Sequence, residues 1–234
     1  MSNILALDTS TENCSAALSI NGQVLVRELE SPREHTKRIL PMVDSLLTEA
    51  GIKLNDLDAL AFGRGPGSFT GVRIGTGIAQ GLAFGADLPM LPISTLAAMA
   101  QGAHRLHNVT DVLPAIDARM GEIYFAHYKL NEVGVMTLVD KEIVITPDQL
   151  LADFNKSETA FHTLGTGWST YAEQLADLKV AQLTVCEDIQ FPSALDMLAI
   201  AAAEFELGHA VAVEDAMPVY VRDTVTWKKL PGRE

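Results

Sequence analysis

Apolar and polar positions in the first fifty residues switch from short strand-like runs to the spacing of a helix. The apolar runs predict three strands, at residues 4–8, 14–20 and 23–28. Asn21-Gly22, between the second and third runs, is a strong signal for a type I′ hairpin turn. Apolar residues then recur at helical spacing up to Gly51, a suitable C-cap. Pro41 lies in this pattern, so it either kinks the helix or occupies its first turn.

Strands and helices alternate along the rest of the chain. Further strands are expected at residues 57–62, 88–93, 112–116, 122–130, 142–145 and 161–165. Further helices are expected at 70–86, from 94 or 95 to about 105, from starts near Pro147 and Trp168, and at 193–207. The strand, polar turn and strand at 112–130 echo the first hairpin at 4–20, which suggests two similar halves. The pattern therefore predicts an α/β protein with mixed sheets, divided into residues 1–106 and a smaller unit, 107–234.

A glycine-rich loop, Gly63-Arg-Gly-Pro-Gly67, joins a predicted strand to a predicted helix. Ser68 or Thr70 can cap that helix. Such a loop is suited either to holding an anion or to packing closely against another backbone. It has neither the spacing of a P-loop nor the fingerprint of a dinucleotide site, so the loop alone leaves the chemistry open.

Small residues recur every four positions in the helix behind this loop, on two nearly opposite faces. One track is Gly71, Gly75 and Ala79, and the other is Gly77, Gly81 and Gly85. Each glycine inside a helix costs about 1 kcal/mol relative to alanine, so close backbone approach has to offset that cost. One face is expected to press onto the sheet, and the other onto a second helix, from this chain or from another.

Composition and charge narrow the classes of partner. The hydrophobic content of 48% over 234 residues predicts a sizeable core. The formal net charge of −13 opposes direct contact with nucleic acid, so another component would hold any RNA. Cys14 and Cys186 lack metal-ligand spacing and are expected to be buried free thiols in a reducing compartment. With no visible signal peptide and no long apolar stretch, the sequence predicts a cytoplasmic protein with no membrane association.

Several motifs together resemble a known family. Asp8 and Asp117 stand in the first turn of each half, as in the actin-like ATPase superfamily of sugar kinases, heat-shock proteins and actin. The segment Gly63-Arg-Gly-Pro-Gly-Ser-Phe-Thr-Gly-Val-Arg-Ile-Gly75, with Leu-Asp-Thr-Ser-Thr at 7–11, closely resembles the bacterial TsaB (YeaZ) family. The resemblance extends along essentially the whole chain. It implies an actin-like (ASKHA) α/β fold of two similar halves, each with a mixed β-sheet flanked by helices.

The resemblance also implies a function. Members of this family are needed to make threonylcarbamoyladenosine beside the anticodon of tRNAs that read codons beginning with A. The catalytic work there belongs to a larger paralogue, TsaD, with which TsaB forms a heterodimer, and an ATPase, TsaE, joins them. Because the chain is acidic, its contact with tRNA is expected to be indirect. The surface that binds the partner is expected to form a homodimer when the partner is absent.

The metal site of the catalytic paralogue is not expected here. That paralogue carries His-x-x-x-His just after the strand that follows the glycine-rich helix, whereas this chain has Thr95 and Met99 at those places. A hydroxyl and a thioether are poor substitutes for imidazole at a divalent metal. His104 and His107 lie nearby, but isolated histidines of this kind more often lie on the surface or cap a helix.

The nucleotide site is expected to be degenerate. Actin-like ATPases clamp phosphates between two hairpin turns, and neither turn here has the glycine that usually follows the aspartate. Asp8, Asp117 and Gly165 are the remaining candidates for contact with a nucleotide. The sequence therefore predicts no cofactor of its own, and leaves open an adenine nucleotide at the interface with the partner.

The favoured hypothesis is a non-catalytic partner subunit that binds through the helices at 36–50 and 70–85. The residues predicted for that interface are Ile39, Leu40, Val43, Leu46, Gly71, Gly75, Gly77 and Gly81. The alternative is a stand-alone ATP-dependent phospho- or carbamoyltransferase that uses Asp8, Asp117 and Gly165. A protease is a third hypothesis, but the six histidines are scattered and no His-Glu-x-x-His motif is present.

Overall fold

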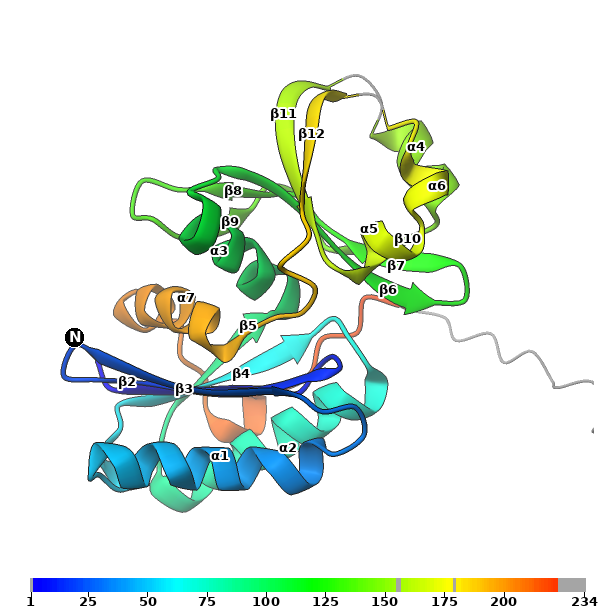
Figure 1. The fold of residues 1–234 in the computed structure, drawn as a ribbon. Helices are drawn as coiled ribbons and strands as arrows, with labels where there is room; N and C mark the ends of the chain where they lie inside the picture. Colours follow the sequence, from blue (N-terminus) through cyan, green and yellow to red (C-terminus); the bar gives the residue numbers. More distant parts are fainter. Residues whose placement is uncertain (1, 155–156, 179, 223–234) are drawn as a thin grey trace, which may run out of the picture.

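The first half of the chain forms a five-stranded mixed sheet (Figure 1). The computed structural model describes residues 2–154, 157–178 and 180–222. The sheet has the order β3-β2-β1-β4-β5, with β1 at Ile4–Asp8, β2 at Asn13–Ile20, β3 at Gln23–Glu30, β4 at Ala59–Gly65 and β5 at Met90–Ser94. The first three strands are antiparallel, whereas β1, β4 and β5 run parallel. Asn21 and Gly22 both have positive φ, of 49° and 81°, which confirms the predicted hairpin.

The second half forms a seven-stranded mixed sheet, so the predicted α/β architecture is confirmed. Its strands are β6 at Asp111–Arg119, β7 at Glu122–Phe125, β8 at Tyr128–Leu130, β9 at Met136–Leu138, β10 at Ile143–Ile145, β11 at Ser157–Leu164 and β12 at Val180–Cys186. The single strand expected at 122–130 is wrong: β7 pairs with β6 and β10, and β8 pairs with β6 and β9. Strands β9 and β12 were not predicted.

Helices cover both faces of the first sheet (Figure 1). They are α1 at His35–Ala50, α2 at Phe69–Ala86, α3 at Thr95–His107, α4 at Pro147–Asp153, α5 at Thr166–Thr170, α6 at Ala172–Leu175 and α7 at Ala194–Glu206, with 3₁₀ turns η1 at Leu54–Asp56 and η2 at Val213–Asp215. Helices α1 and α2 lie on one face, and α7 lies on the other, between this sheet and α3. Gly51 caps α1 with φ of 68°, as predicted, and Pro41 lies inside this helix.

Strand β1 shows how the core is divided. Its apolar side chains alternate between two clusters: Leu5 and Leu7 pack with α1 and α2, whereas Ile4 and Ala6 pack with α3 and α7. A strand covered on both faces carries a continuous apolar run, which is the pattern seen in the sequence. A third cluster, around Trp168, forms the core of the second half.

Helix α7 corrects the predicted division into residues 1–106 and 107–234. The boundary does separate the two sheets, because α3 ends at His107 and β6 begins at Asp111. However, α7 returns to the first sheet, where the Ala194 amide donates to Ser15 Oγ at 2.9 Å. The chain from α7 to residue 222 therefore packs largely with the first half. In the described part of the chain, no helix has the length and apolarity needed to cross a membrane.

Candidate functional site

The inner face of α2 packs tightly on the turn that follows β1. A Cβ added to Gly71 would lie 2.2 Å from the Thr9 carbonyl oxygen, and one on Gly75 would lie 2.7 Å from Thr9 Oγ1. The Thr9 hydroxyl donates to the Gly71 carbonyl at 2.7 Å. The prediction that one face of this helix presses against the sheet is confirmed, and the need for close backbone approach explains its glycines.

The opposite face of α2 is open in the part of the chain that the structure describes. A Cβ added to Gly77, Gly81 or Gly85 would meet no heavy atom within 4 Å. Phe84, on the same helix, is 81% exposed. We call these four residues the outer face of α2. Nothing among the described residues offsets the helical cost of its glycines, about 1 kcal/mol each.

Part of the predicted partner interface lies inside the chain. Five of its residues are buried, so their assignment to a partner surface is wrong: Ile39, Val43, Leu46, Gly71 and Gly75. The three side chains pack against the first sheet, and the two glycines pack against Thr9. Leu40 is 46% exposed, and Gly77 and Gly81 are open; for these three the interface stays a prediction.

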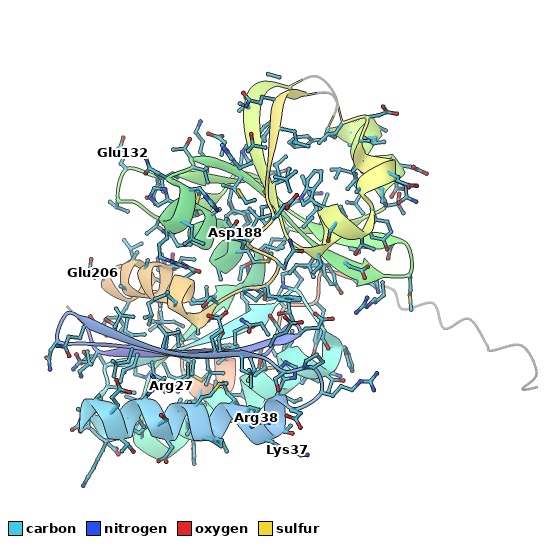
Figure 2. The ribbon with its side chains drawn as sticks, in the orientation of Figure 1. Arg27, Lys37, Arg38, Glu132, Asp188 and Glu206 are labelled. Carbon is cyan, nitrogen blue, oxygen red and sulfur yellow. The ribbon has the colours of Figure 1, made fainter. Side chains whose placement is uncertain are left out.

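Charged side chains lie on α1 and beside it (Figure 2). Figure 2 shows Lys37 and Arg38 at one end of α1 and Arg27 of β3 beside the same helix. Arg38 pairs with Glu34 at 2.7 Å, and Arg27 pairs with Glu49. Exposed pairs of this kind contribute little to stability, so they shape the charge of the surface more than they hold the fold.

The glycine-rich loop packs against the first aspartate turn. A Cβ on Gly67 would lie 2.3 Å from the Ser10 carbonyl oxygen, and the same oxygen accepts a hydrogen bond from the Ser68 amide at 2.7 Å. Ser68 also caps α2, accepting from the Gly71 amide at 3.3 Å. The sequence left two roles open for these glycines, holding an anion or packing closely against another backbone. The geometry supports close packing.

Gly67 therefore gives a direct test of this packing. Gly67→Ala is expected to lower the free energy of unfolding by at least about 2 kcal/mol, because the new methyl group would collide with backbone on another segment. Gly85→Ala is the matched control, since its methyl group meets nothing and should stabilise α2 by up to about 1 kcal/mol. Urea denaturation of both variants measures the difference. Equal stabilities would contradict the close packing.

Asp8 is buried and holds its own turn. Its side chain accepts hydrogen bonds from the Ser10 amide at 3.0 Å and from the Ser10 hydroxyl at 2.9 Å. A Cβ on Gly63 would lie 1.8 Å from Asp8 Oδ2, so the carboxyl group fills the space beside that glycine. Burial raises the pKa of Asp8 from 3.8 to about 6.

The other nucleotide candidates are also engaged within the chain. Asp117 accepts from the Arg119 amide at 2.9 Å, from the Arg119 guanidinium at 2.6 Å and from the Tyr171 hydroxyl at 3.2 Å. Gly165 has φ of 96°, and a Cβ there would lie 2.3 Å from the Ala115 carbonyl oxygen. Gly165 is thus explained by packing on β6.

A cavity of about 680 Å³ lies between the two halves. The turn at Ser10–Glu12 lines it from the first half, and the turn at Asp117–Met120 lines it from the second. Asp117 lines this cavity, whereas Asp8 and Gly165 do not. Residues 219–222 also line it, and nothing in the sequence pattern indicated this, because the segment forms neither helix nor strand.

The positions that replace the paralogue's histidines are buried. Thr95 is 1% exposed and its hydroxyl donates to Ser10 Oγ at 3.2 Å, and Met99 is 1% exposed in the core. His104 Nδ1 lies 3.0 Å from the Val109 carbonyl oxygen, and His107 Nε2 lies 3.0 Å from the Asp188 carboxylate. No cluster of three or more potential ligands from His, Cys, Asp or Glu is found in the described ranges.

Comparison with known proteins gives consistent matches. The family model described as TsaD, tRNA N6-adenosine threonylcarbamoyltransferase, matches residues 28–229. The chain is 52% identical over 233 residues to the tRNA threonylcarbamoyladenosine biosynthesis protein TsaB of Escherichia coli strain K12, covering 99% of each protein. It is 49% identical to the protein of the same name in Haemophilus influenzae, covering 99% of this chain and 98% of that protein.

Two solved structures are also similar to this chain over nearly its whole length. YeaZ from Pseudomonas aeruginosa matches with a TM-score of 0.86 and 44% identity, covering 94% of this chain and all of that one (100%). A second structure, described as an uncharacterized protein with similarity to peptidase YEAZ from the same organism, matches with a TM-score of 0.87 and 44% identity, covering 95% and 100%. Together with the two mixed sheets, these matches confirm the predicted α/β fold and the resemblance to YeaZ.

Proposed function

Because the chain belongs to the TsaB family of tRNA threonylcarbamoyladenosine biosynthesis proteins, we propose that it serves that tRNA modification as a non-catalytic subunit. In this role it binds a TsaD-type catalytic paralogue in a heterodimer, which a TsaE-type ATPase joins. The modified residue is the adenosine next to the anticodon in tRNAs that read codons beginning with A. The chain contacts tRNA only through its partners.

The outer face of α2 is the observation that carries this proposal. Its three glycines leave the helix backbone uncovered over three successive turns, with no heavy atom of the described chain where a side chain would stand. Glycines spaced in this way allow the backbone of another helix to approach closely. Phe84 adds a large exposed aromatic side chain to the same helix, and aromatic residues are enriched at protein interfaces. A partner helix seated here would offset the cost of the glycines.

A non-catalytic role fits the positions at which the paralogue carries its metal ligands. Thr95 and Met99 are buried and offer neither imidazole nor carboxylate. Asp8 and Asp117, the two turn aspartates, are already hydrogen-bonded within the chain. The net charge of −13 supports indirect contact with tRNA, since phosphate would be repelled.

The cavity between the halves supports one alternative, a stand-alone ATP-dependent transferase. The two aspartate turns face this cavity, and a volume of about 680 Å³ lies in the range of small-molecule sites. This alternative requires the isolated chain to bind ATP. Our proposal instead places any adenine nucleotide at the interface with the partner.

Size-exclusion chromatography with light scattering tests the proposal. The chain alone is expected to elute as a homodimer, and to convert to a one-to-one heterodimer when mixed with the catalytic paralogue of its host. Both assemblies then use the same surface and compete for it. If the chain forms no complex with the paralogue at micromolar concentration, the proposal is refuted. Thermal stabilisation of the isolated chain by ATP would favour the transferase.

A further inference from the structure

The chain after η2 runs from the first half to the second along the cavity (Figure 1, the orange-red segment). We call residues 217–222 the strap. It begins on the first half, where Gln80 of α2 donates to the carbonyls of Val213 and Ala216 at 3.3 and 3.0 Å. Its residues 219–222 line the cavity. The strap is thus the wall of the cavity that touches both halves.

The strap is attached to the first half by one backbone bond and one stack. The Val219 amide donates to the Arg64 carbonyl at 2.8 Å. The rings of Tyr220 and Phe69 have centroids 5.9 Å apart, and the Arg73 guanidinium lies 3.4 Å from the Phe69 centroid and 5.3 Å from that of Tyr220. Cation–π contacts at exposed positions contribute about 0.5–1 kcal/mol each, so this end is held weakly.

Arg222 attaches the strap to the second half. Its guanidinium donates to the Ala118 carbonyl at 3.0 Å and pairs with Glu122 at 2.6 Å, on either side of the β6–β7 turn. The side chain is only 16% exposed, which makes this the stronger end. Its Nε is buried without a hydrogen-bond partner among the described residues, so the attachment is incomplete.

Helix α3 of the first half also packs on β6, β8 and β9 of the second, and none of its residues lines the cavity. Glu142 of the second half pairs with Arg64 at 3.1 Å and also accepts from Ser94, but none of these three residues lines the cavity. Across the cavity itself, Arg119 pairs with Glu12 at 3.1 Å, and Arg119 is 73% exposed. An exposed pair contributes about 1 kcal/mol at most, so the strap is the firmer of these two contacts across the cavity.

We propose that the strap is a releasable clasp. It holds together two lips of the cavity, the glycine-rich loop with the start of α2 (64–73) and the β6–β7 turn (117–124). Release of either end opens the cavity without unfolding either half. An occupant of the cavity then contacts the strap as one of its walls, and release of the strap widens access to the cavity. The inference does not depend on the proposed partner role.

Hydrogen exchange of the full-length chain tests the clasp through crossed effects. Tyr220→Ala removes the contact with the first lip and is expected to raise amide exchange about tenfold in the second lip, 117–124. Arg222→Ala removes the contact with the second lip and is expected to raise exchange about tenfold in the first, 64–73. These changes are of the size expected when a stacked or charge-assisted contact is lost. Exchange in the buried part of α3, residues 96–103, should stay unchanged.

The matched control is Arg38→Ala, which removes an exposed ion pair on α1, away from the strap (Figure 2). It should leave both lips unchanged. If each strap variant loosens only the lip that it touches, the strap is a local contact and the clasp is refuted. Faster exchange in both lips and in α3 alike would show general destabilisation, which also refutes it. Tyr220 is 47% exposed, so its variant is expected to fold.

Discussion

Gly81→Leu is expected to abolish binding of the catalytic paralogue while the chain stays folded. A leucine there would project from the outer face of α2 into space that no described atom occupies. Within the chain it should stabilise the helix by about 1 kcal/mol, because leucine is a far better helix former than glycine. Within the complex it would hold the two helices apart, and a well-packed interface centre does not tolerate such a change. Calorimetric titration with the paralogue should show affinity lowered by about a hundredfold or more.

Gly75→Leu on the opposite face is the matched control. Its Cβ would lie 2.7 Å from Thr9 Oγ1, so this variant should lose stability before any effect on binding can be read. The pair separates a helix face that packs inside the chain from one that is free for a partner. If Gly81→Leu is folded and binds the paralogue with unchanged affinity, the outer face of α2 is not the interface and the proposed function loses its main support.

Local signals in the sequence predict the first half well. The turn at Asn21-Gly22, the cap at Gly51 and the inner glycines of α2 (Gly71 and Gly75) each meet a particular geometric requirement, and the structure shows it. Strand β1 is recognisable because burial on both faces demands a continuous apolar run. In the second half, the sequence pattern does not predict strands β9 and β12. Strand β9 has only three residues, and β12 carries exposed Val185 at the edge of its sheet, so neither gives a clear alternation.

The candidate site was predicted less well, because periodicity does not say what a helix face packs against. Ile39 and Val43 form a clear apolar stripe on α1, and that stripe serves the chain's own sheet. The two glycine tracks of α2 look alike in the sequence, yet one packs on Thr9 and the other is open. Only the three-dimensional arrangement separates them.

Contacts between distant segments explain the remaining differences. The return of α7 to the first sheet depends on Ser15 and on the pairing of Arg105 with Asp196 at 2.6 Å. Nothing in the spacing of these residues links them along the chain. The strap is irregular and carries no periodic pattern, so its place beside the cavity follows from contacts at its two ends, of Val219 with Arg64 and of Arg222 with the β6–β7 turn.

Asp8→Asn is expected to stabilise the chain at neutral pH and to flatten its stability profile. Burial raises the pKa of Asp8 from 3.8 to about 6, so the folded chain binds this proton more tightly than the unfolded chain does. Stability from this group is fully present below about pH 4, and it is lost as the pH rises through 6. The loss is of the order of 3 kcal/mol. Asparagine keeps an acceptor for the Ser10 amide and carries no charge, so it avoids that loss.

Urea denaturation between pH 4 and 8 measures this effect, with Asp44→Asn as the control for the same change in net charge at an exposed position on α1. The wild-type chain and the control should both lose stability as the pH rises, and Asp8→Asn should lose much less. Matching profiles for all three chains would contradict a carboxyl group whose pKa is raised by burial. A loss of stability in Asp8→Asn at pH 7 would mean that the chain needs the carboxylate ion. A carboxylate ion at this turn is what a phosphate- or metal-binding transferase would use, so that outcome would favour the transferase over the partner subunit.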